Sequence, residues 1–241
     1  MASNSADFYR TRRIADHPRR QTSPRRVHDL LRAGIRDGRL RPGQRLVETA
    51  LVQEFGTSRN AIREAMQDLA AEGLVTRRPR EGTMVAGEIL RIPLDQLYAE
   101  RDSQLVTTRR IETRRLRTTP EVAARLGHAV REVNVTEVLY LLRGEPIAVW
   151  VDYVDADFVQ PTFFETSADM ASSFERFFGA PFGRMESTLE ARLCELRTMR
   201  LLGLTEPAAV LVRELVLFDE DDLPRALVFA HYRADRVSFS H

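Results

Sequence analysis

Three side chains that can recognise DNA bases lie within five positions of one another: Arg59, Asn60 and Arg63. Arginine can donate two hydrogen bonds to guanine in the major groove, and asparagine can bind adenine in the same two-point manner. Ser58 precedes them and is a preferred N-cap residue, so they would lie in the first turns of a helix. The free N–H groups at such a helix end can also bind a phosphate.

The surrounding sequence predicts how this helix is held. Its apolar residues recur at helical spacing and leave the three polar side chains on another face: Ile62, Ala65, Met66 and Leu69. Helices are predicted before it from 23 to 38 and from 48 to 55, and strands after it over 74–76 and 83–85. This order is a winged helix-turn-helix, with Gly56-Thr57-Ser58 as its tight turn. A solvated basic helix face is the alternative, but the complete order of elements favours DNA.

The distribution of charge agrees with this interpretation. Residues 1–91 hold 18 Arg and 11 acidic residues, whereas residues 92–241 hold 18 Arg and 24 acidic residues. A basic half joined to an acidic half indicates that only one of them meets a polyanion. Residues 1–22 are predicted to be a disordered basic arm, which is either a solvated tail or a segment that contacts phosphate or the minor groove.

The stretch from Pro42 to Ala86, with Phe55-Gly56 and Ser58-Arg59 in register, resembles the winged-helix domain of GntR-type bacterial transcription regulators. The resemblance implies a DNA-binding domain over 23–87, and the residues expected to contact DNA are Thr49, Ser58, Arg59, Asn60, Arg63, Arg80, Gly82 and Thr83. Two positions depart from the family pattern. Thr49 stands where Arg is common, and Glu81 introduces a negative charge in the wing.

Residues 88–102 are predicted to be a linker, and an internal repeat follows. Residues 119–155 and 196–235 each contain a short helix ending in Leu-Gly and two strands joined by a polar turn. Apolar strands joined by such turns predict an α+β domain with an antiparallel sheet and two similar halves. Residues 103–241 resemble the effector-binding (UTRA) domain of the HutC subfamily, whose fold is similar to chorismate lyase. Cys194 is predicted to lie in a helix as a small apolar residue.

The resemblance also bears on the ligand. Sugar-phosphate-binding relatives have Arg and Glu at positions that here carry Val138, Tyr140, Trp150 and Ala226, so a less charged, apolar or aromatic effector is expected. The residues expected to bind it are Tyr140, Trp150, Asp152, Ser173, Glu175, His231 and Tyr232. For Trp150, a place in the hydrophobic core is an equal alternative.

Signatures of catalysis are missing from the sequence. The five histidines lack metal-ligand spacing, and no phosphate-cradling or nucleotide motif is present. We therefore expect no enzyme activity, no metal and no cofactor.

No apolar run is long enough for a membrane helix, and the single cysteine fits a reducing, cytoplasmic location.

Together these patterns predict a regulator that binds a pseudo-palindromic operator in double-stranded DNA as a homodimer. It would be a repressor released by a small-molecule effector of unknown identity. Two alternatives stay open: a regulator without an effector, and an enzyme with a chorismate-lyase-like domain, which the fused DNA-binding domain disfavours.

Overall fold

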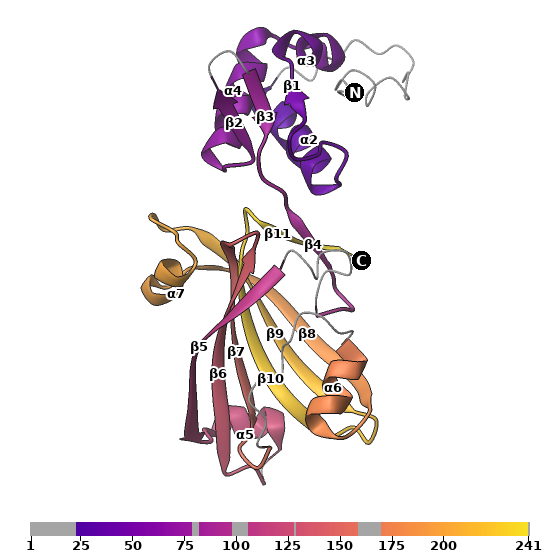
Figure 1. The fold of residues 1–241 in the computed structure, drawn as a ribbon, viewed down its shortest axis with the longest axis vertical. Helices are drawn as coiled ribbons and strands as arrows, with labels where there is room; N and C mark the ends of the chain where they lie inside the picture. The colour runs from indigo at the N-terminus through magenta and orange to yellow at the C-terminus, as the bar shows by residue number, and fades with distance from the viewer. Residues whose placement is uncertain (1–22, 79–81, 98–105, 128, 159–169, 241) are drawn as a thin grey trace. The chain divides into compact units, whose positions relative to one another are not determined.

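The computed structural model describes residues 23–78, 82–97, 106–127, 129–158 and 170–240. The chain divides into two compact units, Met1–Leu90 and Arg91–His241 (Figure 1). The expected basic arm, residues 1–22, lies outside the described residues.

The first unit is the predicted winged helix-turn-helix. Its elements are α2 (Pro24–Arg36), β1 (Arg45–Leu46), α3 (Glu48–Phe55), α4 (Arg59–Ala71), β2 (Val75–Arg78) and β3 (Gly82–Val85). The three strands form a small antiparallel sheet in the order β1-β3-β2. Strand β1 was not expected, and it extends the predicted hairpin on its β3 side.

Local sequence explains why these helices begin and end where they do. Ser23 caps α2 by accepting a hydrogen bond from the backbone N–H of Arg26 (3.3 Å), and Pro24 follows in the first turn. Gly56 ends α3 in the left-handed conformation (φ 58°), which costs glycine little. The core of the unit buries one face of each helix, including Leu31, Leu51 and Met66.

The second unit is built on a six-stranded antiparallel sheet in the order β5-β6-β7-β10-β9-β8. Its strands are β5 (Val106–Arg117), β6 (Glu132–Leu142), β7 (Glu145–Asp155), β8 (Phe182–Leu193), β9 (Ala209–Asp219) and β10 (Pro224–Arg233). The order is symmetric about the β7–β10 pair, with halves β5-β6-β7 and β8-β9-β10. The internal repeat predicted the hairpins β6-β7 and β9-β10, but not the outer strands β5 and β8.

Three helices accompany this sheet: α5 (Pro120–Leu126), α6 (Met170–Phe178) and α7 (Leu196–Leu201). Leu126 of α5 packs with Val133 and Val216, and Leu202, just after α7, packs with Leu139 and Val149. Because these strand residues belong to one alternating set, α5 and α7 pack on the same face of the sheet. We call it the helix face. The side away from α5 and α7 we call the open face, a label that says nothing about its exposure to solvent.

Two segments differ from expectation. Residues 189–193, predicted to be helical, form the end of β8, so Cys194 lies in the link between β8 and α7. The backbone hydrogen bonds that β8 makes with β9 prevail over a sequence rich in helix formers. The expected linker also contains β4 (Leu90–Pro93), which forms a two-stranded sheet with β11 (Val237–Ser240).

Candidate DNA-binding and effector sites

Helix α4 presents the predicted base-reading side chains to solvent. Its N-cap, Ser58, accepts a hydrogen bond from the backbone N–H of Ala61 (3.2 Å) and so sets where the helix begins. Arg59, Asn60 and Arg63 are exposed, while the buried residues of α4 are Ala61, Ile62, Ala65, Met66 and Leu69. The structure therefore brings the three side chains together on the outer side of its first two turns.

An acidic side chain that the sequence analysis did not single out lies beside them. Glu48, the first residue of α3, has its carboxylate 3.8 Å from the Arg63 guanidinium and 3.9 Å from that of Arg77 on β2. Arg77 also donates a hydrogen bond to the backbone carbonyl of Arg63 (3.3 Å). These three residues join both helices of the helix-turn-helix to the wing. Because they come from three separate elements, only the tertiary structure reveals the cluster.

The remaining predicted DNA contacts fall into different positions. Thr49 is exposed in the first turn of α3, and Gly82 begins β3 with a positive φ of 87°. The expectation for Thr83 needs correction, because its side chain is buried (7% exposed) between neighbouring strands and cannot reach DNA as placed. Arg80 lies outside the described residues.

Four of the expected effector-binding residues share the open face of the second unit. Strand register places Tyr140 beside Ala148, Trp150 beside Val138 and Ala230, and Tyr232 beside Ala148. The rings of Tyr140 and Trp150 are 4.7 Å apart between centroids, and those of Trp150 and Tyr232 are 6.1 Å apart. All three rings are buried, so Trp150 belongs to a packed aromatic cluster, as the core alternative predicted.

Asp152 is the fourth residue on this face. It lies between Thr136 of β6 and Val228 of β10 and is 5% exposed. Burial raises the pKa of its carboxyl group to about 7, and a hydrogen bond with its own backbone opposes that shift only in part. Its Oδ1 atom has no hydrogen-bond partner among the described residues.

The expected grouping of His231 with these aromatic residues is wrong. Successive strand residues point to opposite faces, so His231 lies on the helix face, beside Val149 and Val212, while Tyr232 lies on the open face. Burial lowers the pKa of the His231 imidazole, which favours its neutral form.

On α6, Ser173 is buried and Glu175 is exposed, so this helix also separates two residues that were expected to act together.

The open face also contains a buried cation. Arg213 of β9 is fully buried, and its guanidinium donates hydrogen bonds to the carbonyl oxygens of Leu94 (2.5 Å) and Gln96 (2.7 Å) and to the hydroxyl of Ser187 (2.8 Å). These bonds hold the segment after β4 against the sheet. Burial lowers the pKa of Arg213, and the nearby Tyr232 hydroxyl partly compensates.

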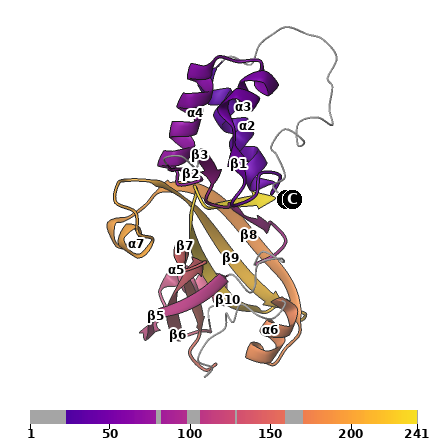
Figure 2. The ribbon, with the colours of Figure 1, turned by 45° about the horizontal axis from the view of Figure 1, so that its top comes forward.

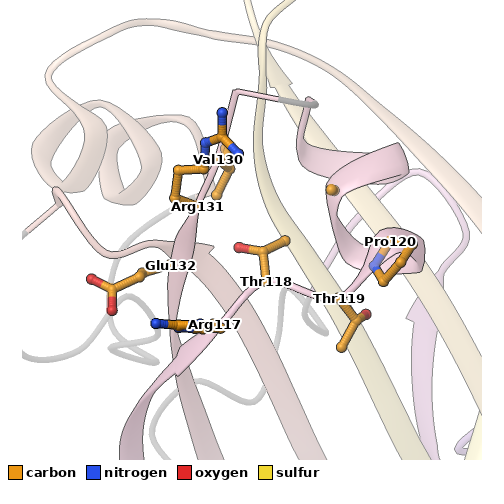
Figure 3. A pocket seen from close by; sticks show the side chains of 8 residues that line it. Arg117, Thr118, Thr119, Pro120, Val130, Arg131 and Glu132 are labelled. Carbon is orange, nitrogen blue, oxygen red and sulfur yellow. The ribbon is translucent and has the colours of Figure 1, made fainter.

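A hollow of about 570 Å³ lies at one end of the sheet, away from these residues in sequence and register. It is lined by Arg117, Thr118, Thr119, Pro120, Ala123, Val130, Arg131 and Glu132. The side chains of Arg117 and Arg131 point in different directions (Figure 3), so they do not form a convergent anion site. None of the predicted effector-binding residues lines this hollow.

Among the described residues, His, Cys, Asp and Glu form no group of three or more that could hold a metal ion. None of the described helices is both long and apolar enough to cross a membrane. Figure 2 shows α4 and the strands β2 and β3 within the first unit.

Two family models match the chain. Residues 24–85 match the model of bacterial regulatory proteins of the gntR family, and residues 103–238 match the UTRA domain. The second match alone covers more than half of the chain.

Individual relatives match over nearly the whole length. The transcriptional repressor NagR of Bacillus subtilis is 26% identical over 230 residues, covering 89% of this chain and 92% of that protein. The transcriptional repressor PhnF of Mycolicibacterium smegmatis is 25% identical over 224 residues, covering 88% and 91%. The crystal structure of PhnF from Mycobacterium smegmatis has the same fold, with a TM-score of 0.60 at 24% identity over 89% of this chain and 97% of that chain.

Proposed function

This chain belongs to the GntR family of bacterial regulatory proteins and carries a UTRA domain, and from that premise we propose that it represses transcription until a small molecule binds its second unit. The chain is a DNA-binding transcription regulator, in line with two relatives that are named transcriptional repressors. We place it in the cytoplasm, where its DNA target would be. The proposed regulator needs no catalytic group.

The observation that carries this proposal is the exposed polar face of α4. Arg59, Asn60 and Arg63 have the donors and acceptors that read base edges, and they lie at the N-terminal end of a recognition helix. The buried stripe on the opposite side fixes the orientation of this face. Ser58 and Thr49, both exposed beside it, are suited to contact phosphate.

A homodimer with one recognition helix per half-site would match a pseudo-palindromic operator. The second unit offers two sheet edges for such a dimer, β5 and β8. Strand β5 is poorly suited to pair with its own copy, because its charged residues are Arg109, Arg110, Glu112, Arg114, Arg115 and Arg117. Like charges opposite one another destabilise a strand pair.

Strand β8 has a self-complementary pattern instead. It carries two basic and two acidic residues, Arg184, Glu186, Glu190 and Arg192. If two copies pair antiparallel about Leu189, Glu186 of one copy faces Arg192 of the other and Met185 faces Leu193. Pairing about Thr188 would place Glu186 opposite Glu190, which is unfavourable. Leu189 and Leu193 are 38% and 80% exposed, so this edge also has apolar surface to bury.

We propose that the effector binds at the open face of the second unit, close to Asp152 and Trp150. Effector binding must favour a state of the dimer with lower DNA affinity, because a ligand shifts an equilibrium only through its different affinity for the two states. A regulator without an effector remains the alternative. It predicts that no small molecule changes DNA affinity.

Selection of binding sites from randomised duplex DNA tests the proposed function. The wild-type chain, Arg59→Ala and Arg41→Ala would be put through the same selection. Arg41→Ala is the control, because it also removes one exposed positive charge from the first unit. We expect the wild type and Arg41→Ala to enrich the same palindrome and Arg59→Ala to lose base preference. If no motif is enriched by the wild type, sequence-specific DNA binding is contradicted.

A further inference from the structure

Asp152 is a buried acid that forms no ion pair within the described part of the chain. Its Oδ1 atom has no hydrogen-bond partner among the described residues, although the residue is only 5% exposed to solvent. Its neighbours across the sheet, Thr136 and Val228, carry no charge. An ionised carboxylate in such a place is costly unless it is paired or hydrogen-bonded.

Two of the arginines on the same face have other partners. Arg213 donates to the carbonyls of Leu94 and Gln96, and Arg115 forms an ion pair with Glu132 (2.7 Å). Arg110 lies in the row of Val138 and Trp150, which is the row next to that of Asp152. None of the ion pairs found among the described residues includes Asp152.

The residues next to Asp152 suit the apolar part of an organic cation. Trp150 lies two residues before it on the same strand and face, and Tyr140 stacks on Trp150 in a tilted arrangement. Aromatic faces attract cations. The diagonal neighbours on β10 are Ala226 and Ala230, so short side chains flank the carboxyl group.

We propose that Asp152 binds the positively charged group of the effector, and that the effector is an organic cation, such as a protonated amine, with an apolar or aromatic body. The inference rests on the proposed function, because it names the chemical class of the molecule that the second unit recognises. A carboxylate at this position repels phosphates and carboxylates. A bound cation would supply a partner that the Oδ1 atom lacks among the described residues, and burial would strengthen the attraction.

Matched probes of different charge test this proposal on the full chain. Phenethylamine, 2-phenylethanol and phenylacetate each have two carbon atoms between the ring and the polar atom, and they are cationic, neutral and anionic. Butylamine, 1-butanol and butyrate form a matching aliphatic series. Each would be added at millimolar concentration while thermal unfolding is followed. We expect at least one amine to raise the unfolding temperature and the neutral and anionic members of its series to have no comparable effect.

Two variants assign the effect to the carboxyl group. Asp152→Asn keeps the shape of the side chain and should weaken binding of the stabilising amine by about tenfold or more, because a hydrogen bond to a charged group is lost. Asp155→Asn, on the same strand but the opposite face, should bind it as the wild type does. The proposal is overturned if no amine stabilises the chain, if an anionic probe binds better, or if Asp152→Asn binds the amine unchanged.

Release from DNA separates this inference from the proposed function. A stabilising amine should also lower affinity for the selected operator, and Asp152→Asn should stay bound to DNA in its presence. If the wild type binds no specific DNA but still binds the amine through Asp152, the proposed function fails and the ligand assignment stands. If DNA binding is specific and every amine is without effect, the ligand assignment alone fails.

Discussion

The carboxylate of Glu48 at the start of α3 lies 3.8 Å from the guanidinium of Arg63 on α4. Both side chains are partly exposed, at 35% for Glu48 and 59% for Arg63. An exposed pair of this kind contributes little to stability, about 0.2–1 kcal/mol. Its consequence is for DNA binding, since it places a negative charge where the DNA backbone is expected and competes for an arginine that we propose reads bases.

The first prediction concerns removal of this negative charge. Glu48→Gln should bind the selected operator about two- to fivefold more tightly, because Arg63 and Arg77 lose an internal partner and repulsion of phosphate falls. The gain should shrink as salt is raised. Fluorescence anisotropy at two salt concentrations measures it, with Glu206→Gln as a control that removes one acid from the second unit. Weaker binding by Glu48→Gln would instead assign Glu48 to orienting Arg63.

The second prediction concerns the recognition helix. Arg63→Ala should lose about 1–3 kcal/mol of specific binding free energy and relax base preference, whereas an arginine that contacts only phosphate would weaken all sequences alike. Titration against the selected operator and against a scrambled duplex separates the two cases. Arg41→Ala again provides the control. Equal losses on both duplexes would move Arg63 from base reading to phosphate binding.

The third prediction concerns the buried guanidinium of Arg213. Arg213→Met keeps much of the apolar stem but leaves the carbonyls of Leu94 and Gln96 without their donor. Each buried group that loses its partner costs about 1–3 kcal/mol, so we expect a loss of about 3 kcal/mol or more in unfolding free energy. Trp150 is the only tryptophan of the chain, so its fluorescence during urea unfolding reports on this unit. Arg200→Met on α7 should change stability much less.

Features that depend on a few neighbouring residues could be predicted from the sequence. The N-cap Ser58, the buried stripe of α4 and the left-handed Gly56 are local, and the structure confirms the winged helix-turn-helix built from them. The repeat likewise predicted the hairpins β6-β7 and β9-β10, because each copy is a helix followed by two strands, whereas the outer strands β5 and β8 lie outside it.

Features that depend on distant residues were missed. Strand β8 contains good helix formers, yet pairing with β9 decides its conformation. Arg213 finds its partners more than a hundred residues away, at Leu94 and Gln96. The separation of His231 from Tyr232 could have been predicted from the sequence. The two residues are adjacent in a strand, so their side chains must point to opposite faces of the sheet.

The fourth prediction tests the proposed dimer edge by charge exchange. Glu186→Arg would place two arginines opposite each other at each of the two Glu186–Arg192 contacts and should weaken the dimer. The double change Glu186→Arg with Arg192→Glu restores opposite charges and should recover it. Sedimentation over a range of protein concentrations measures the dissociation constant. If the single variant dimerises as well as the wild type, the dimer does not form through β8.

The fifth prediction follows from the raised pKa of Asp152. Its carboxyl group has a pKa of about 7 in the folded chain, against an ordinary value of 3.8. Between these pH values the folded chain keeps a proton that the unfolded chain has released. The contribution of Asp152 to stability is therefore fully present below the ordinary value, falls as pH rises toward 7, and stays low above it.

Asp152→Asn removes this dependence, because the amide is neutral at every pH. The variant should have the same unfolding free energy as the wild type at about pH 4. Between that pH and neutral pH it should become progressively more stable than the wild type, by at most about 1.4 kcal/mol for each pH unit. Urea unfolding at about pH 5 and about pH 8 measures the difference, and contributions of other titrating groups cancel between the two proteins. The carboxyl group of Asp155 accepts a hydrogen bond from the backbone N–H of Asp157 (3.1 Å). Asp155→Asn should therefore not become more stable than the wild type at the higher pH. A constant difference between Asp152→Asn and wild type across the range would show that Asp152 is ionised and already paired in the folded chain.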